Sequence, residues 1–444
     1  MMKSRKELEQ RFGKILVNGG AGFLTYCFSN NTYVILFFLL GFSWILPFQA
    51  RTICLTLIIL FYCVDHIVFK QYYINKIFIV FLVFFLITLT HLAVMNLYEL
   101  IRFGYIPFHD IYTSPGRDIL KLTLVVAWMY VAVNILGKYI HNGLLISSFT
   151  NGFNVFVIVL LCFLPSVIGD GVRLAMTFQE SEDPMHPNRV AYVMLLFFYL
   201  NLLSSFYANK VLVKIYHWFF CILNFAFIVM TLSRTSLAVL LVGLTCLLFF
   251  RKKILCVLLL GAMAFGLYIV TFDENFFLNL PINERFTARR AIEDGGSGRD
   301  RVWMDYLTHA SLKHYLIGIG YDSPTQGILY QKPLRHWVAR DRFLGIYSPH
   351  NTYLNNLLTF GIIGFIIYLY FLYFLGKKII INAMSNTGTP RIYFAMFVSF
   401  VIWGLFENPD FTSIMFISIF LSQIIQLDNF FLKDGIDETR IDCA

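Results

Sequence analysis

The chain has 444 residues, of which 58% are hydrophobic, 18% aromatic and only 14% charged, and its formal net charge is +9. A soluble domain has about 25% charged residues, so this composition leaves too little polar surface for a water-soluble fold. The length would allow about two or three soluble domains, but apolar runs recur from residue 33 to residue 427. A soluble globular protein is therefore excluded, and a polytopic integral membrane protein is indicated.

The apolar runs predict an all-α membrane protein with about 12 transmembrane helices. A bilayer core is crossed by about 20 mostly apolar residues, and the backbone groups within it must bond to one another, which favours helices. The run at 146–168 is the least regular, because it contains Asn151, Gly152 and Asn154. The predicted spans are 32–50, 52–69, 77–97, 118–137, 146–168, 189–208, 211–232, 235–250, 254–272, 352–375, 391–407 and 411–427.

These spans divide the chain into three parts. Residues 1–272 hold the first nine helices, residues 273–351 form one large polar loop, and residues 352–444 hold the last three helices and a tail. An even number of spans places both termini on one side of the membrane. The mixed, basic N-terminal segment does not have the pattern of a cleavable signal peptide.

The distribution of basic residues predicts the orientation. On this map 18 of the 35 basic residues flank the membrane on the side of the termini, and seven lie in the short loops opposite. The positive-inside rule then places both termini in the cytoplasm and the large loop in the periplasm. The inner side has 13 Lys and 5 Arg, whereas the outer side has 3 Lys and 14 Arg. Because Arg binds phosphate bidentately, this bias suggests a phosphate-bearing ligand at the outer face. Snorkelling of interfacial side chains is the alternative.

The centre of the large loop combines flexible glycines with arginines. Gly295-Gly296-Ser297-Gly298 leads into a helical stretch at about 300–316, whose apolar positions include Trp303. Arg299 and Arg301 fall in or next to its first turn, where backbone N–H groups also favour an anion.

Three other outer segments carry candidate residues. Arg234 stands between two apolar runs, flanked by hydroxyl side chains, and is either a snorkelling residue or part of a polar pocket. His350 lies where the large loop meets the tenth span, either as an interfacial residue or as a base, and Asn351 or Thr352 can cap that helix. The loop at 169–188 contains Arg173. The same loop also holds Asp183 and His186, but no second cluster of ligands completes a metal site there. Elsewhere in the sequence, the eight cysteines do not have the spacing of a zinc site.

Taken in order, these segments resemble the O-antigen polymerase/ligase superfamily. The resemblance rests on Arg173 with Pro187-Asn188, on Ser233-Arg234-Thr235-Ser236, on Gly298-Arg299 with Trp303, Gly318 and Gly320, and on His350-Asn351 with Leu354, Gly361 and Gly364. Its strongest part covers about 298–364. The first 140 residues match only as hydrophobic spans.

The resemblance implies a GT-C-like inverting glycosyltransferase that needs no metal or other cofactor. Its donor would be an oligosaccharide on undecaprenyl pyrophosphate, with no nucleic-acid partner. His350 would be the general base, and Arg234, Arg299, Arg173 and, less firmly matched, Arg301 would hold the pyrophosphate. Asn188, Asn351 and Trp303 would support the site.

This reading favours a polysaccharide polymerase in a bacterial inner membrane, with a chain-length regulator left open as a partner. The ligase branch, which transfers the finished glycan to a lipid A core, is the first alternative, and a protein O-glycosylation branch stays open. A lipid-linked oligosaccharide flippase is the alternative from another class. It would predict internal repeats and short outer loops, whereas this sequence shows no evident repeat and one long outer loop.

Overall fold

The structure is a computed structural model, and every regular element among the residues that it describes is helical. The described residues are 30–44, 48–69, 86, 90, 125, 127–132, 134–136, 143–162, 187–231, 233–249, 303–304, 307–308, 310, 312–318, 350–385, 388–407 and 413–423. Four of the described helices are long and apolar enough to cross a membrane. The predicted all-helical class is confirmed to that extent.

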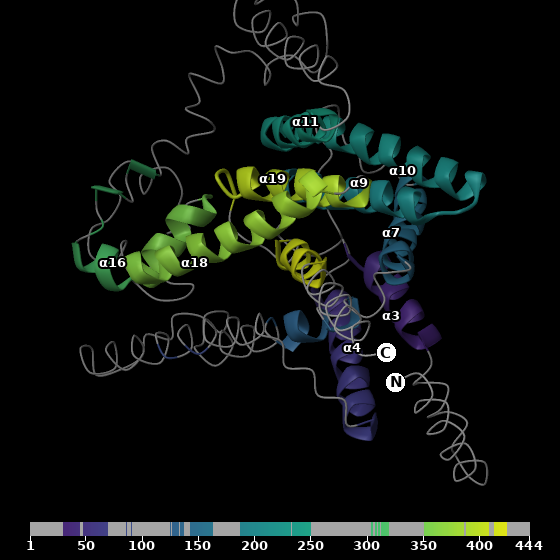
Figure 1. Cartoon of the computed structure of the whole chain (residues 1–444), viewed down its shortest axis with the longest axis horizontal. Coiled ribbons are helices and arrows are strands. Elements are labelled where there is room, and N and C mark those ends of the chain that lie inside the picture. Colours follow the sequence, from purple (N-terminus) through teal and green to yellow (C-terminus); the bar gives the residue numbers. More distant parts are fainter. Residues whose placement is uncertain are drawn as a thin grey trace, which may run out of the picture.

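The helices follow the predicted runs closely in most of the described chain (Figure 1). The least regular prediction, 146–168, corresponds to a helix that starts two residues earlier and is described as far as Cys162. The predictions at 77–97 and 254–272 lie almost wholly or wholly outside the described residues. The described helices are α3 (Asn30–Phe42), α4 (Phe48–Phe69), α7 (Leu144–Cys162), α9 (Pro187–Tyr207), α10 (Val211–Met230), α11 (Arg234–Phe249), α16 (Leu312–Ile317), α18 (Thr352–Ser385), α19 (Thr389–Trp403) and the helix Ser413–Gln423.

Two predicted boundaries were wrong. The first span was predicted to continue to residue 50, but α3 ends at Phe42 and α4 begins at Phe48, directly after Pro47 in the sequence. Proline has no backbone N–H, so it suits the start of a new helix better than the middle of one. The tenth span was predicted to end at residue 375, before Lys377 and Lys378, yet α18 continues to Ser385. A helix that leaves the apolar core of the membrane keeps its own hydrogen bonds, so charges mark the membrane surface and not the helix end.

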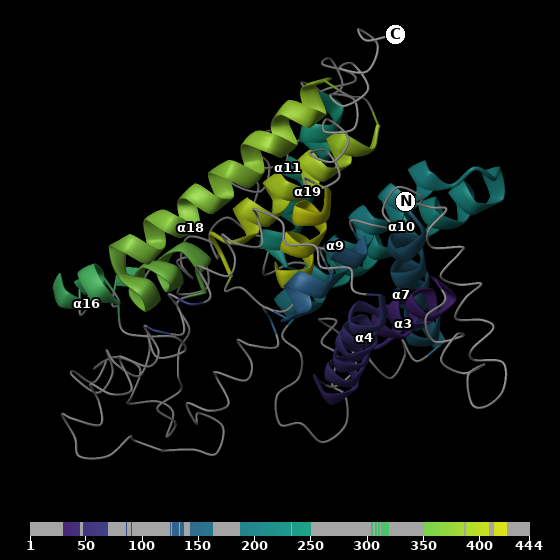
Figure 2. The ribbon, with the colours of Figure 1, turned by 60° about the horizontal axis from the view of Figure 1, so that its bottom comes forward.

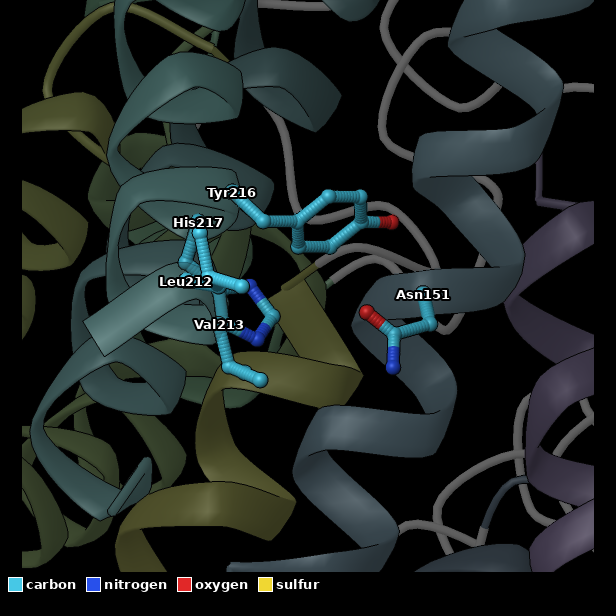
Figure 3. A pocket seen from close by; sticks show the side chains of 5 residues that line it. All are labelled: Asn151, Leu212, Val213, Tyr216 and His217. Atoms are coloured by element: carbon cyan, nitrogen blue, oxygen red, sulfur yellow. The ribbon is translucent and has the colours of Figure 1, made fainter. Parts of the chain in front are cut away.

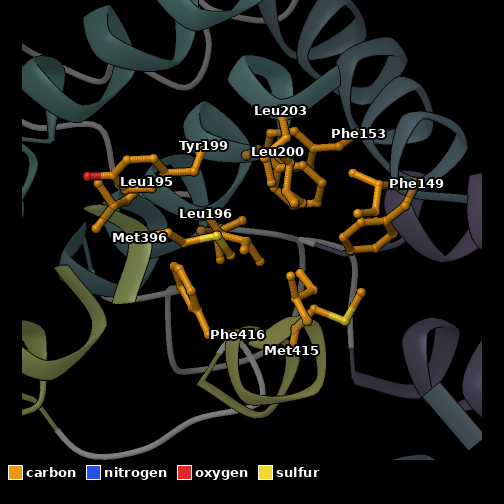
Figure 4. Close-up of a cluster of buried hydrophobic side chains, with 14 of the residues drawn as sticks. Phe149, Phe153, Leu195, Leu196, Tyr199, Leu200, Leu203, Met396, Met415 and Phe416 are labelled. Carbon is orange, nitrogen blue, oxygen red and sulfur yellow. The ribbon is translucent and has the colours of Figure 1, made fainter. Parts of the chain in front are cut away.

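Helix α9 lies at the centre of the bundle. Of its apolar stretch, 89% is buried, compared with 33% for α10. It contacts α7, α10, α11 and α19. Its apolar side chains meet those of α7, α19 and the helix Ser413–Gln423 in one core (Figure 4). Phe153 and Phe197 stack there with ring centroids 3.6 Å apart.

Helices α9 and α19 run antiparallel, and contacts at three levels fix their register. Tyr192 stacks on Trp403 with centroids 4.2 Å apart. The Tyr199 hydroxyl lies 2.7 Å from that of Ser399, and the Tyr207 hydroxyl lies 3.5 Å from that of Tyr393. The N-terminal end of α9 therefore lies beside the C-terminal end of α19.

Helices α3 and α7 approach closely through two glycines. A Cβ atom on Gly41 would overlap the carbonyl group of Phe149, and one on Gly152 would overlap that of Phe38. Small residues that let two backbones meet are typical of helix contacts in membranes. Ser148 adds a hydrogen bond to the carbonyl oxygen of Val34 across the same contact.

Helix α18 is long and kinked near its start. Gly361 has φ 65° and ψ −173°, which lies outside the helical region. Figure 2 shows α18 running beside α19, with α16 against one end of α18. The beginning of α18 is therefore held between the membrane bundle and a segment of the large loop.

Candidate active site

Two side chains from distant parts of the sequence meet at the candidate site. His350, just before α18, places its Nδ1 atom 3.1 Å from Oε2 of Glu407, just after α19. The His350 side chain is 44% exposed, whereas that of Glu407 is 11% exposed. The imidazole is therefore accessible from outside the bundle, and the carboxylate lies beneath it.

Glu407 is fixed by further hydrogen bonds from two other residues. The Nδ2 group of Asn188, at the start of α9, donates to Oε1 of Glu407 at 2.7 Å. The hydroxyl of Thr352 donates to the Glu407 backbone oxygen, also at 2.7 Å. The backbone N–H of Thr352 donates to the oxygen of Gly404 at 2.7 Å. The ends of α9, α18 and α19 are thus joined through one carboxylate and the turn that carries it.

The backbone around His350 is set by the start of α18. Asn351 caps this helix, because its Oδ1 atom accepts hydrogen bonds from the N–H groups of Tyr353 at 3.0 Å and Leu354 at 2.9 Å. Of the two predicted caps, Asn351 and Thr352, the structure therefore shows Asn351 in this role. His350 itself has φ 47°, a left-handed conformation that few non-glycine residues adopt. Such conformations persist where the surroundings enforce them, and often at functional sites.

The arrangement determines which imidazole nitrogen can act as a base. An ionised carboxylate only accepts hydrogen bonds, so Nδ1 of His350 carries the hydrogen that faces Glu407. In the neutral imidazole the lone pair then lies on Nε2. A carboxylate in this position also stabilises the imidazolium that forms when Nε2 takes a proton. The His350–Glu407 pair has the form of an oriented general base.

Arg234 and Trp303 lie on other elements of the structure. Arg234 is the first residue of α11, behind Ser233, whose hydroxyl accepts a hydrogen bond from the Ser236 N–H at 3.4 Å. The two serine hydroxyls lie 2.8 Å apart. Trp303 is half-buried in the loop segment that precedes α16.

The loop segment is attached to the helix that follows His350. Tyr315 and Ala310 pack against Leu358 of α18, as does Leu354 from the same helix. At the kink, a Cβ atom on Gly361 would overlap the carbonyl group of Leu316. These contacts hold part of the large loop within about three helical turns of His350.

Three predicted site residues, Arg173, Arg299 and Arg301, lie outside the described residues. Of the predicted residues that are described, Asn188, His350 and Asn351 lie together at the candidate site. The structure adds Glu407, which was not predicted from the sequence. This residue ends the predicted span 391–407, where a charged side chain is expected at the membrane surface without a further role. The signal for it was present. Glu407 is an acidic side chain at the outer end of a helix, on the same predicted side of the membrane as His350.

A comparison with protein families gives one match. Residues 219–369 match the family described as O-antigen ligase, and no curated protein matches the chain. The matched stretch, about a third of the chain, includes His350, Arg234, Arg299 and Trp303 and ends short of Glu407.

Four described helices are long and apolar enough to cross a membrane, and the polar cluster around Glu407 lies where the ends of α9, α18 and α19 meet. The match over residues 219–369 supports the predicted resemblance to the superfamily of O-antigen polymerases and ligases. Members of that superfamily are glycosyltransferase-like enzymes.

Proposed function

We propose that this protein is a polysaccharide polymerase that transfers a growing glycan from undecaprenyl pyrophosphate to the next lipid-linked repeat unit. The observation that carries the proposal is the His350–Glu407 pair, in which the carboxylate orients the imidazole at 3.1 Å. The family match over residues 219–369 supports the reaction class.

In the proposed reaction, Nε2 of His350 removes the proton from the acceptor hydroxyl as its oxygen attacks the anomeric carbon of the donor sugar. The bond from that carbon to the pyrophosphate oxygen breaks, and the lipid pyrophosphate leaves with the negative charge. One displacement of this kind inverts the anomeric configuration. Glu407 remains a carboxylate and stabilises the imidazolium.

Positively charged groups held close to the leaving pyrophosphate would stabilise the negative charge that develops on it. Guanidinium groups can stabilise a pyrophosphate without a metal ion, and Arg234 and Arg299 are assigned this role, with Arg173 and Arg301 assisting. The proposal places the site on the periplasmic side of the inner membrane, with both termini in the cytoplasm, within a GT-C-like fold of about 12 helices.

The ligase branch is the second candidate, and the family description favours it by name. Both branches share the donor and differ in the acceptor. A polymerase makes a ladder of products from the lipid-linked repeat unit alone, whereas a ligase forms product only when a lipid A core acceptor is added.

The test uses full-length protein in detergent, lipid-linked repeat unit as donor, and EDTA, with and without a lipid A core. The expected result is a polymer ladder from the repeat unit alone, with a loss of about 10²–10⁴-fold in rate for His350→Gln, because an amide cannot accept the proton. Tyr373→Phe, at a position on α18 that is 62% exposed, is the control and should keep full activity.

Each other outcome contradicts a defined part of the proposal. Equal rates for wild type and His350→Gln would exclude His350 as the base. Product only in the presence of the lipid A core would replace polymerase by ligase. A requirement for a divalent metal would remove the metal-free mechanism.

A further inference from the structure

A second polar group of side chains lies inside the bundle, away from the His350–Glu407 pair. Asn151 of α7 lines an open pocket of about 510 Å³ together with four residues of α10, which are Leu212, Val213, Tyr216 and His217. Figure 3 shows the amide of Asn151 directed across this space toward the rings of Tyr216 and His217. None of the five residues is a Lys, Arg, Asp or Glu, so the pocket wall offers hydrogen bonds and apolar surface.

The pocket lies near the other end of the bundle from the candidate active site. His217 contacts Asn201 of α9, which is thirteen positions after Asn188 (188 to 201). At a rise of 1.5 Å per residue, this separation is about 20 Å along the helix axis. The pocket therefore faces the membrane leaflet opposite the His350–Glu407 pair.

A buried amide network fixes the hydrogen on the His217 ring. The Nδ2 group of Asn201 donates to the oxygen of Phe197 at 2.9 Å and to Oδ1 of Asn154 at 3.0 Å, which sets the orientation of the amide. Its Oδ1 atom then accepts from Nδ2 of Asn154 at 2.9 Å and from Nδ1 of His217 at 2.9 Å. Because Nδ1 is the donor, the lone pair of the neutral ring lies on Nε2.

The pocket therefore presents two hydrogen-bond acceptors that the described residues do not satisfy. Oδ1 of Asn151 is buried and has no hydrogen-bond partner in the described part of the chain. Among the same residues, His217 makes its one hydrogen bond through Nδ1, so Nε2 is the second acceptor. An acceptor in an apolar interior is costly unless a donor reaches it. The pocket is suited to a ligand that carries hydroxyl groups.

Two exposed lysines flank the pocket-lining residues in the sequence: Lys210 stands two positions before Leu212, and Lys214 directly follows Val213. The carbonyl oxygen of Lys210 accepts hydrogen bonds from the N–H groups of Val213 and Lys214 at 3.1 Å, so these residues form the first turn of α10. Lys214 lies three positions before His217, which puts both on one face of the helix. Neither lysine has an ion-pair partner among the residues that the structure describes. Basic residues at a membrane surface attract anionic lipid head groups.

Apolar surface continues from the mouth along α10. Leu212 is 80% exposed, and Ile215 and Phe219 are also largely exposed. We propose that the pocket binds an anionic phospholipid with a hydroxyl-bearing head group, of the phosphatidylglycerol class, in the leaflet opposite the candidate active site. The hydroxyls donate to Asn151 Oδ1 and His217 Nε2, the phosphate lies at the two lysines, and the acyl chains cover the apolar face of α10.

The test titrates the full-length protein in detergent with dioleoylphosphatidylglycerol or dioleoylphosphatidylcholine and measures thermal unfolding and retained lipid by native mass spectrometry. The wild-type protein should retain phosphatidylglycerol and unfold at a higher temperature, with half-saturation at least about tenfold below that of phosphatidylcholine, which corresponds to about 1.4 kcal/mol. Leu212→Trp, which fills the mouth, should lose this response. Ile222→Trp, at a 67% exposed position on the same helix, should keep it.

Two further variants test the chemistry of binding. Asn151→Leu removes an acceptor without removing a hydrogen bond among the described residues, and it should weaken phosphatidylglycerol binding while the protein remains folded. The double variant Lys210→Gln, Lys214→Gln should bind phosphatidylglycerol more weakly than the wild type does, and its preference for phosphatidylglycerol over phosphatidylcholine should be smaller; an unchanged preference would exclude the two lysines from the site. Equal responses of the wild type to the two lipids would overturn the anionic head group. Equal responses of Leu212→Trp and Ile222→Trp would overturn the location.

Discussion

Asn188 donates a hydrogen bond to one oxygen of the Glu407 carboxylate, and His350 faces the other oxygen of the same group. Asn188 and Glu407 are 219 positions apart in the sequence. One carboxylate is thus shared between a side-chain amide at the start of α9 and the proposed base. The amide fixes the rotation of the carboxylate, and the carboxylate fixes the imidazole.

Glu407→Gln should reduce the rate of polymer formation by about 100-fold or more. The introduced amide has one accepting oxygen and one donating nitrogen, so it cannot accept from Asn188 and from Nδ1 of His350 at once. If the nitrogen faces His350, the ring must change tautomer and lose the lone pair on Nε2. The measurement is the initial rate with purified enzyme, and thermal unfolding in detergent shows whether the variant is folded. An unchanged rate would remove Glu407 from the mechanism.

A compensating change at position 188 should restore part of that activity. Asn188→Asp alone should be harmful, because it places a second carboxylate against Glu407. Combined with Glu407→Gln, the new carboxylate accepts from the new amide nitrogen, and the amide oxygen again accepts from His350. The double variant should be at least about tenfold faster than Glu407→Gln, which corresponds to about 1.4 kcal/mol of recovered activation free energy. The coupling free energy is this gain plus the loss that Asn188→Asp causes alone. Purely additive losses would show that the hydrogen-bond pattern is not what matters.

Gly361→Ala should destabilise the protein more than a positive φ angle alone would do. The backbone of Gly361, at φ 65° and ψ −173°, lies in a region essentially restricted to glycine, which costs another residue about 1–3 kcal/mol. The new Cβ atom would also overlap the carbonyl group of Leu316, and such overpacking adds about 1–3 kcal/mol. Thermal unfolding in detergent measures the loss.

Gly388→Ala is the matched control for that experiment. Gly388 has φ 87°, but the nearest atom to a Cβ added there is 3.9 Å away, in Phe206. It therefore reports the backbone cost without the overlap. If both variants lower the unfolding temperature equally, the contact between α16 and the kink in α18 contributes nothing measurable.

Arg299→Lys and Arg234→Lys should each impair polymer formation although they keep the charge. A lysine cannot bind a pyrophosphate through the planar, bidentate fork of arginine. Arg51→Lys is the control, because Arg51 lies over the ring of Trp44 and is assigned no part in binding the donor. The rate of polymer formation is measured for each variant over a range of donor concentrations. The donor concentrations at half-maximal rate are then compared with that of the wild type. Full activity of both site variants would refute the pyrophosphate role.

Topology can be measured independently of activity. A periplasm-dependent reporter fused after residue 320 should be active, and one fused at the C-terminus should be inactive, because the distribution of basic residues predicts cytoplasmic termini. The opposite result at either position would contradict the orientation proposed for the site.

The helices were easier to predict than the contacts of the site. Apolar runs long enough to cross a membrane predicted α7, despite its asparagines, and α9 almost to the residue. Asn351 was recognisable as a helix cap because capping depends on neighbouring residues. The role of Glu407 was not predictable in this way, because it depends on three helix ends that meet only in the folded bundle. The hydrogen bond of Asn154 to Asn201 likewise joins residues 47 positions apart, which no local pattern reveals.

The close contact between α3 and α7 bears on how the chain is made. During synthesis α3 leaves the ribosome before α7, and Ser148, on α7, hydrogen-bonds to a residue 114 positions earlier. Until α7 follows, the surface at Gly41 lacks the backbone against which it packs in the folded bundle. The two helices then meet backbone to backbone, where a methyl group on either glycine would keep them apart. Replacing Gly41 or Gly152 should therefore impair biogenesis, leaving inserted chains that fail to assemble and are removed by proteases.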